Sequence, residues 1–297
     1  MNVIKNGFIA GFHLIFFSLT SCTGTNYPVI EKDLVIESKI LKQEVEYSLM
    51  LPSGYYEKNK NYPVVYLLHG FGGDNNSWLA RCNIDHMVDS LRNCNSIGEF
   101  IYVMPEAMKT YYINNFDSSI MYGDFMVKEL VQFIDKTYRT KPGAEYRALL
   151  GMSMGGFGAI IQGLQNYNSF KTIVVMGGAM RTDQMFISLS QDRYEKFFSP
   201  VFGPELSDQS RITEHWKQNS PYNLIDSTSR DKLKESNLYI DCGLYDSLWP
   251  SNKALHELLL EYKIPHEFHC RPGGHNWSYW YKSTARGLIY ISEKIPD

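Results

Sequence analysis

The chain has 297 residues, of which 44% are hydrophobic and 14% aromatic, and its formal net charge is −3. This length and apolar content are enough to bury the core of one large domain. The near balance of 29 basic and 32 acidic residues argues against nucleic-acid binding, which needs a concentrated basic patch. The sequence also contains no internal repeat and no long run of like charge, which excludes a repeat protein and a charged interaction tail.

The first 21 residues have the pattern of an export signal. Residues 7–19 are apolar but too few to span a bilayer comfortably. Residues 19–22 (LTSC) resemble a bacterial lipobox, in which the chain is cut before the cysteine and the cysteine is lipidated. We expect residues 1–21 to be a lipoprotein signal peptide, Cys22 the lipidation site and residues 22–33 a tether. The protein would then be an exported bacterial lipoprotein, anchored to a membrane and facing the periplasm or the cell surface. An ordinary secretory signal and a buried N-terminal helix are the alternatives.

Short apolar runs alternate with helical patterns along the rest of the chain. Strands are predicted within 34–51 (two), and at 64–68, 100–105, 146–150, 172–178, 238–243 and 266–270. Helices are predicted at 84–91, 125–138, 157–164, 252–262 and 276–294. Continuous apolar strands that alternate with helices predict an α/β domain, with a mostly parallel sheet and helices on both faces.

This pattern breaks between about residues 180 and 236. The stretch is polar and aromatic, is interrupted by several prolines and glycines, and is too long for a plain loop. We interpret it as a cap of short helices inserted into a single domain that spans residues 34–297.

The sequence GMSMGG at residues 151–156 stands between a predicted strand and a predicted helix. G-x-S-x-G in this context is typical of a nucleophile elbow, where a sharp turn exposes a serine above the sheet. Small neighbours let the strand and helix approach each other closely. Ser153 is therefore the candidate nucleophile, and a packing turn with an idle serine is the alternative.

A serine nucleophile needs a histidine base, which in turn needs an acid to orient it. Among the histidines that follow Ser153, His275 lies in a glycine-rich loop just beyond a predicted strand, where a base can reach the nucleophile. Asp246 and Asp241 compete for the role of acid. Asp246 is favoured because it lies in the loop beyond its strand, whereas Asp241 lies inside the strand. His69 follows the strand at 64–68 and is expected to brace its loop.

Four ordered motifs together resemble the esterase D superfamily of α/β-hydrolases, which includes feruloyl and acetyl-xylan carbohydrate esterases. They are HGFGG at 69–73, RALLGMSMGG at 147–156, CGLYD at 242–246 and GGHNWSYW at 273–280. The resemblance implies an α/β-hydrolase fold and a Ser153–Asp246–His275 triad. It also implies an oxyanion hole formed by the backbone N–H groups of Phe71 and Met154, and it implies no cofactor or metal.

Aromatic residues follow the predicted strand ends where open α/β sheets bind ligands. Tyr111, Tyr112, Trp249 and Trp277 are therefore the candidate substrate-binding residues, and their rings suit a feruloyl group or a sugar face. The expected activity is hydrolysis of feruloyl or acetyl esters of plant polysaccharide. A siderophore esterase, an S-formylglutathione-type thioester hydrolase and a non-catalytic carbohydrate-binding lipoprotein are the alternatives.

Cysteine spacing leaves the disulfide question open. After Cys22, the chain contains Cys82, Cys94, Cys242 and Cys270. Cys82 could pair with Cys94, and Cys242 with Cys270 if their strands are neighbours, but four free thiols are equally compatible with the sequence.

Overall fold

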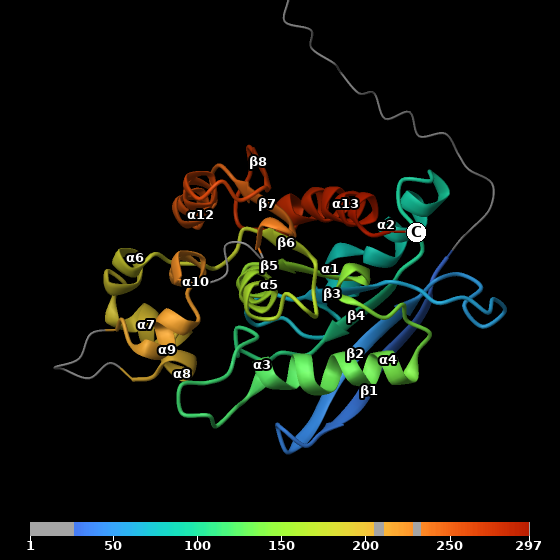
Figure 1. The fold of residues 1–297 in the computed structure, drawn as a ribbon, viewed down its shortest axis with the longest axis horizontal. Coiled ribbons are helices and arrows are strands. Elements are labelled where there is room, and N and C mark those ends of the chain that lie inside the picture. The colour runs from blue at the N-terminus through green and yellow to red at the C-terminus, as the bar shows by residue number, and fades with distance from the viewer. Residues whose placement is uncertain (1–26, 205–210, 228–232, 297) are drawn as a thin grey trace, which may run out of the picture.

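The structure is a computed structural model that describes residues 27–204, 211–227 and 233–296. Within these residues, eight strands form one sheet in the order β1-β2-β4-β3-β5-β6-β7-β8 (Figure 1). The strands are β1 (Val29–Ser38), β2 (Gln43–Leu51), β3 (Val64–Leu68), β4 (Ile101–Pro105), β5 (Arg147–Met152), β6 (Thr172–Met176), β7 (Asn237–Gly243) and β8 (Glu267–Arg271). β1 and β2 pair antiparallel, β2 also runs antiparallel to β4, and the strands from β4 to β8 in this order are parallel.

Helices cover both faces of the sheet, as the alternating pattern predicts. One face packs against α3 (Tyr122–Phe125), the π-helical segment Met126–Leu130, α4 (Val131–Thr137), α5 (Met154–Gln165) and α12 (Trp249–Glu261). The other face packs against α1 (Ser77–Cys82), α2 (Ile84–Asn93) and α13 (Trp277–Lys294). A short 3₁₀ turn, Ala144–Tyr146, leads into β5. Every residue of β3, β4, β5 and β6 is buried, which explains their uninterrupted apolar sequences.

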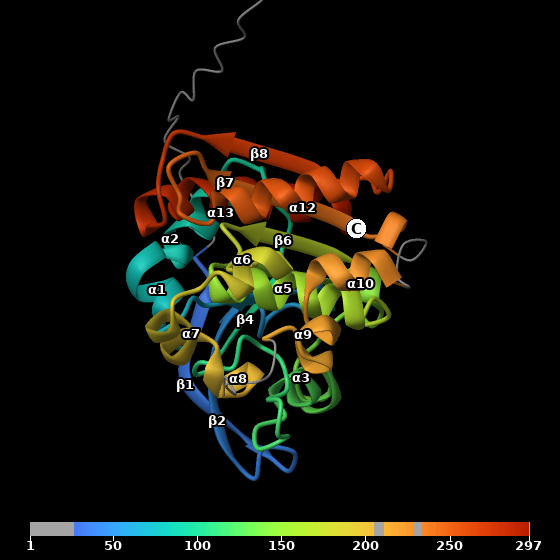
Figure 2. The ribbon, with the colours of Figure 1, turned by 90° about the vertical axis from the view of Figure 1, so that its left-hand side faces the viewer.

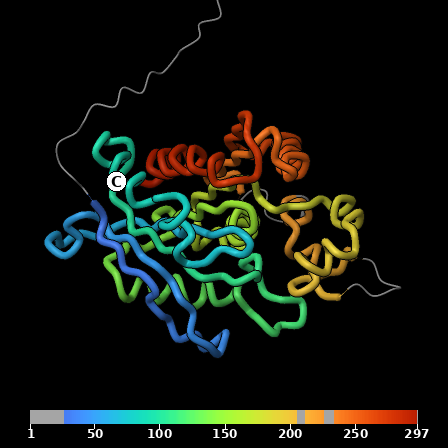
Figure 3. The backbone as a smooth tube through the Cα atoms, turned by 180° about the vertical axis from the view of Figure 1, so that it is seen from behind, coloured from blue at the N-terminus to red at the C-terminus, as the bar shows by residue number. Residues whose placement is uncertain are grey.

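The segment between β6 and β7 forms a group of short helices at one side of the sheet. They are α6 (Asp183–Ile187), α7 (Gln191–Phe197), α8 (Ser199–Phe202), α9 (Glu214–Gln218) and α10 (Pro221–Ser227). Figure 2 faces this group, and Figure 3 shows it at the side opposite the β1–β2 pair. Aromatic side chains hold it together, since Phe186 stacks on Trp216 with ring centroids 3.6 Å apart. We call α6–α10 the cap.

The described residues correct one predicted boundary and show the state of four cysteines. β1 begins at Val29, so the end of the range predicted as tether (22–33) belongs to the sheet, where β1 pairs with β2. The four described cysteines are free, although Cys242 and Cys270 are register partners on β7 and β8. The predicted signal peptide and Cys22 lie outside the described residues. None of the helices described here is long and apolar enough to cross a membrane.

Candidate active site

Ser153 occupies a sharp turn between β5 and α5. Its backbone angles, φ 53° and ψ −117°, are unusual for a residue with a side chain and identify a strained position. Glycine is required on either side of the turn because the neighbouring backbone segments approach so closely. A Cβ atom on Gly151 would lie 2.0 Å from the carbonyl oxygen of Gly155, and one on Gly155 would lie 2.1 Å from that of Leu68. The G-x-S-x-G spacing is thus explained by contact between β5, α5 and the end of β3.

Ser153, His275 and Asp246 form a continuous row of hydrogen bonds. The Ser153 hydroxyl lies 2.8 Å from Nε2 of His275, and Nδ1 of His275 lies 2.8 Å from Oδ2 of Asp246. The His275 side chain is 30% exposed, whereas the Asp246 side chain is completely buried. A carboxylate at Nδ1 favours the tautomer with its proton on Nδ1, which leaves Nε2 free to accept the serine proton.

The loop that carries Asp246 is fixed by backbone and side-chain contacts. Oδ1 of Asp246 accepts a hydrogen bond of 2.8 Å from the backbone N–H of Leu248. The buried Asn252 on α12 donates to the carbonyls of Leu248 and Gly178, and accepts from the Gly178 N–H. Asn252 therefore ties the loop after β7 to the loop after β6, and the sequence patterns did not single it out.

Asp241, the competing acid, lies away from His275 in a separate buried cluster. It accepts a hydrogen bond from the Tyr279 hydroxyl, and its Oδ1 lies 3.7 Å from Nη1 of Arg271. These contacts connect β7, β8 and the start of α13. The geometry therefore gives Asp241 a position inside the fold and Asp246 the position beside the histidine.

Phe71 and Met154, the two residues expected to form the oxyanion hole, are neighbours of Ser153 in the structure. Both residues line the same cavity as Ser153. Met154 is the first residue of α5, so its N–H has no carbonyl acceptor within the helix. The positive end of the helix dipole also lies at this point. Negative charge that develops next to Ser153 would be stabilised there.

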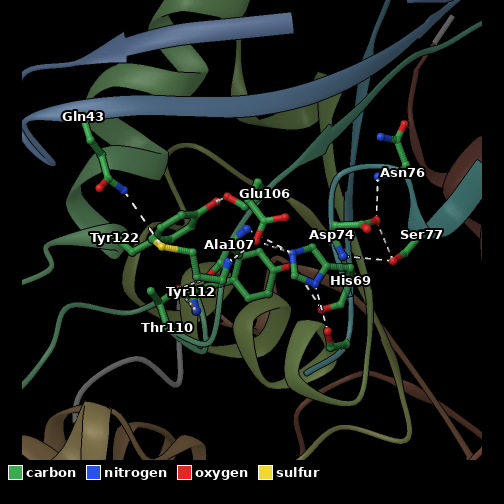
Figure 4. A network of polar contacts seen from close by, with 12 residues as sticks. Gln43, His69, Asp74, Asn76, Ser77, Glu106, Ala107, Thr110, Tyr112 and Tyr122 are labelled. Atoms are coloured by element: carbon green, nitrogen blue, oxygen red, sulfur yellow. Dashed lines mark hydrogen bonds and ion pairs between the residues drawn. The ribbon is translucent and has the colours of Figure 1, made fainter. Parts of the chain in front are cut away.

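His69 braces the loop after β3, as its position in the sequence suggested. Its Nε2 accepts a hydrogen bond of 3.0 Å from the Ala107 N–H, and its Nδ1 lies 2.9 Å from the Gly70 carbonyl (Figure 4). The Tyr112 hydroxyl donates to the His69 carbonyl. Burial lowers the pKa of His69, so the ring is neutral and holds the loops after β3 and β4 together.

Ser153 lies at the meeting point of two cavities. One has a volume of about 290 Å³ and extends beneath the cap. The other has a volume of about 330 Å³ and lies along the glycine-rich loop after β3, next to Trp277. Both include Ser153 and His275 in their walls, so the two halves of an ester could extend to either side of the serine. We call them the cap cavity and the loop cavity.

Aromatic contacts seat the cap over the site. Phe197 packs edge-on against Phe71 with centroids 5.1 Å apart, and Phe198 stacks on Tyr111 at 5.5 Å. The cap residues that line the cap cavity are Leu189, Arg193, Phe197 and Phe198, and Arg181 precedes them. The sequence patterns did not identify these residues, because their approach to Ser153 depends on how the cap folds back onto the sheet.

The four predicted substrate-binding residues divide into two groups. Tyr111 lines the cap cavity and Trp277 lines the loop cavity. Tyr112 and Trp249 are not among the residues that line either cavity, so the structure does not place them beside Ser153 as the sequence pattern predicted. Tyr112 is fully buried and packs where a Cβ on Gly158 would collide with its ring. Trp249 begins α12 and packs on Phe268, with centroids 5.6 Å apart.

The sequence of this chain matches a known protein family. The model of the esterase family, described as "Putative esterase", matches residues 38–291. An acetyl esterase of Caldicellulosiruptor saccharolyticus is 24% identical over 275 residues, which cover 88% of this chain and 97% of that protein.

Solved structures of esterases share the fold over nearly the whole domain. A ferulic acid esterase superposes with a TM-score of 0.76 at 25% identity, covering 91% of this chain and 99% of the other. An S-formylglutathione hydrolase of Staphylococcus aureus has a TM-score of 0.72 at 19% identity, covering 89% and 98%. The predicted α/β-hydrolase fold is confirmed, and the chain belongs to the esterase family as a carboxylic ester hydrolase.

Proposed function

We propose that Ser153, His275 and Asp246 are the catalytic triad of this serine esterase. The observation that carries the proposal is the hydrogen-bonded row with 2.8 Å between Ser153 and His275 and 2.8 Å between His275 and Asp246. A serine hydroxyl attacks poorly near neutral pH unless a base removes its proton. His275 is the base in contact with Ser153, and Asp246 stabilises the imidazolium that forms.

The reaction has two steps with the same tetrahedral geometry. Oγ of Ser153 bonds to the ester carbonyl carbon while its proton passes to Nε2 of His275. The carbonyl oxygen becomes an oxyanion that accepts hydrogen bonds from the N–H groups of Phe71 and Met154. The C–O bond to the alcohol then breaks, and the alcohol leaves with the proton from His275. Water attacks the acyl-serine in the same way, with His275 again as base, and releases the acid.

The proposed substrate is a feruloyl or acetyl ester of plant polysaccharide. Support comes from a family relative named acetyl esterase and from a solved ferulic acid esterase that is 25% identical. Tyr111 and Trp277 offer aromatic surface in the two cavities beside Ser153, and such surface suits a phenolic ring or a sugar face. The S-formylglutathione hydrolase neighbour, at 19% identity, supports the fold alone.

A substrate panel tests this choice. kcat/KM is measured on methyl ferulate, an acetylated xylo-oligosaccharide, a siderophore trilactone and a glutathione thioester. We expect one of the first two to be the best substrate. If the siderophore trilactone or the glutathione thioester is preferred by more than about tenfold, which is ~1.4 kcal/mol of transition-state discrimination, the proposed carbohydrate substrate is wrong. The proposed catalytic triad would not be affected by that result. A chain that binds xylo-oligosaccharide and hydrolyses none of the four would instead fit a non-catalytic binding protein.

We also propose that the protein is an exported lipoprotein, anchored through Cys22. The support is the apolar stretch at residues 7–19 followed directly by LTSC at residues 19–22. Polymeric carbohydrate lies outside the cell, so an anchored esterase that faces outward would meet it there.

A further inference from the structure

The cap side of the active site contains two arginines that have no role in the chemistry described above. Arg181 and Arg193 both line the cap cavity together with Ser153. Arg181 follows β6 and is half-buried, whereas Arg193 lies on α7 and is exposed. The walls of this cavity contain no aspartate or glutamate among the described residues. Two arginines therefore line the space next to Ser153, and no described carboxylate residue lines it with them.

The two arginines are not neutralised elsewhere in the described part of the chain. The Arg181 guanidinium donates a hydrogen bond of 2.6 Å from Nη1 to the Met180 carbonyl. Among the described residues, no carboxylate forms an ion pair with Arg181 or Arg193. Burial is the main cause that lowers the pKa of Arg181, and Arg193 lowers it further, whereas Tyr111 and Asp246 act in the opposite direction. Arginine nevertheless stays charged throughout the physiological range. Two like charges that share a cavity repel each other, and an anion bound between them would relieve the repulsion.

A third cavity continues from the cap cavity along the same arginines. It has a volume of about 480 Å³, and Arg181, Leu189, Arg193 and Ser247 belong to the walls of both cavities. Its other walls include the serines at positions 188, 190 and 251, and again no acidic residue among those described. Arg181 and Arg193 thus lie where the mainly apolar cap cavity meets a more polar cavity lined by serines.

From this arrangement we infer that the half of the substrate held in the cap cavity carries a carboxylate, which Arg181 and Arg193 bind. Guanidinium groups match carboxylate geometry and form charge-assisted hydrogen bonds with it. The apolar walls around Ser153, including Leu189 and Phe198, would hold the carbon chain between the ester and the acid. The inference rests on the proposed serine-esterase function. It agrees with the proposed feruloyl or acetyl substrate if the alcohol half is a uronic acid acylated at a hydroxyl, whereas a dicarboxylic acyl half would replace that substrate.

Matched pairs of esters that differ in one charge test the inference. For a charge in the acyl half, mono(4-nitrophenyl) glutarate is compared with 4-nitrophenyl methyl glutarate, after subtraction of the uncatalysed rate. For a charge in the alcohol half, 3-acetoxybenzoate is compared with its methyl ester. We expect wild-type kcat/KM to favour the anionic member of one pair by about tenfold or more, mainly through KM, and to lose this preference at high salt.

Substitution of the two arginines tests whether they cause the preference for the anionic ester. In Arg181→Gln and in Arg193→Gln the ratio of kcat/KM for the anionic ester to that for the neutral ester should fall severalfold, and in the double variant it should approach one. The fall in this ratio should come from the anionic ester, whose kcat/KM decreases more than that of the neutral ester. Arg181→Lys keeps the charge and should retain part of the preference. Arg286→Gln, which removes an exposed charge from α13, should leave the ratio unchanged. Arg193 is exposed, so its variant tests the inference even if Arg181→Gln folds poorly.

Three outcomes overturn the inference. The first is a wild-type ratio near or below one in both pairs. The second is a preference that survives in the double variant, because the charge would then be bound elsewhere. The third is an equal loss on neutral and anionic esters, which would mean that the arginines hold the cap or stabilise the oxyanion. Failure of the proposed function looks different, because no ester in either pair would then show hydrolysis that depends on Ser153.

Discussion

Replacing Asp246 with asparagine changes one atom of the proposed triad and leaves its volume unchanged. In the native site, Oδ1 of Asp246 accepts from the Leu248 N–H and Oδ2 lies 2.8 Å from Nδ1 of His275. An asparagine that keeps its oxygen toward Leu248 presents its NH₂ group to Nδ1. His275 must then carry its proton on Nε2, where it can no longer accept the proton of Ser153.

The expected loss follows from this change of tautomer. An equivalent change in another serine triad lowers kcat by about 10⁴, which corresponds to about 5.5 kcal/mol of transition-state stabilisation. Because the volume and the Leu248 contact are kept, the melting temperature of Asp246→Asn should stay close to that of the wild type. Hydrolysis of 4-nitrophenyl acetate and thermal unfolding of the same samples measure the two effects.

Asp241→Asn is the matched control, since it makes the same change in a second buried aspartate. Asp241 accepts from Tyr279 and lies 3.7 Å from Arg271, so its loss should weaken the packing of β7, β8 and α13. We expect a lower melting temperature, with a destabilisation of about 1–3 kcal/mol, and a kcat within about tenfold of the wild type. A larger loss of kcat at Asp241 than at Asp246 would refute the assignment of the acid.

Three further predictions test other parts of the account. Gly155→Ala should destabilise the protein by more than about 2 kcal/mol in denaturant unfolding, because the added Cβ would lie 2.1 Å from the Leu68 carbonyl oxygen. Gly98→Ala is the control: a Cβ there would have no atom nearer than 3.5 Å, and it should cost less than about 1 kcal/mol. Equal destabilisation by the two substitutions would contradict the close contact at Gly155. Burial lowers the pKa of His69, so on acidification only the unfolded chain takes up its proton, and stability should fall from pH 7.5 to 5.5 by up to about 1.4 kcal/mol from this residue. His69→Gln should remove that part of the pH dependence, and an unchanged slope would contradict a neutral His69. Cys22→Ala should shift the protein from the detergent phase to the aqueous phase, and equal partitioning of both forms into the aqueous phase would contradict lipidation.

The elements that belong to the parallel sheet could be predicted because local patterns determine them. The apolar run at 64–68 became β3 without a change of bounds, and the predicted helix at 276–294 differs from α13 by one residue. Ser153 and His275 could be proposed as site residues for the same reason, since each follows a strand end in a turn or loop that contains glycine.

Side-chain direction within a loop could not be predicted from its composition. Tyr111 and Tyr112 are adjacent, and both have left-handed backbone angles, with φ of 55° and 61°. This bend places Tyr111 in the cap cavity and Tyr112 against α5, although the two residues are identical in type. The position of Arg181 and Arg193 in the same cavity wall as Ser153 could not be predicted either, because it depends on how the cap packs against the rest of the domain.

Labelling with a fluorophosphonate, followed by peptide mass spectrometry, shows directly whether Ser153 is the nucleophile. We predict one adduct, located on Ser153 and formed in step with the loss of esterase activity. Ser153→Ala should remain folded, take up no label and lose on the order of 10⁴ to 10⁶ in kcat, since the residues of a triad act as a unit. An adduct on another residue, or a Ser153→Ala variant that keeps a tenth of the wild-type activity, would contradict the account.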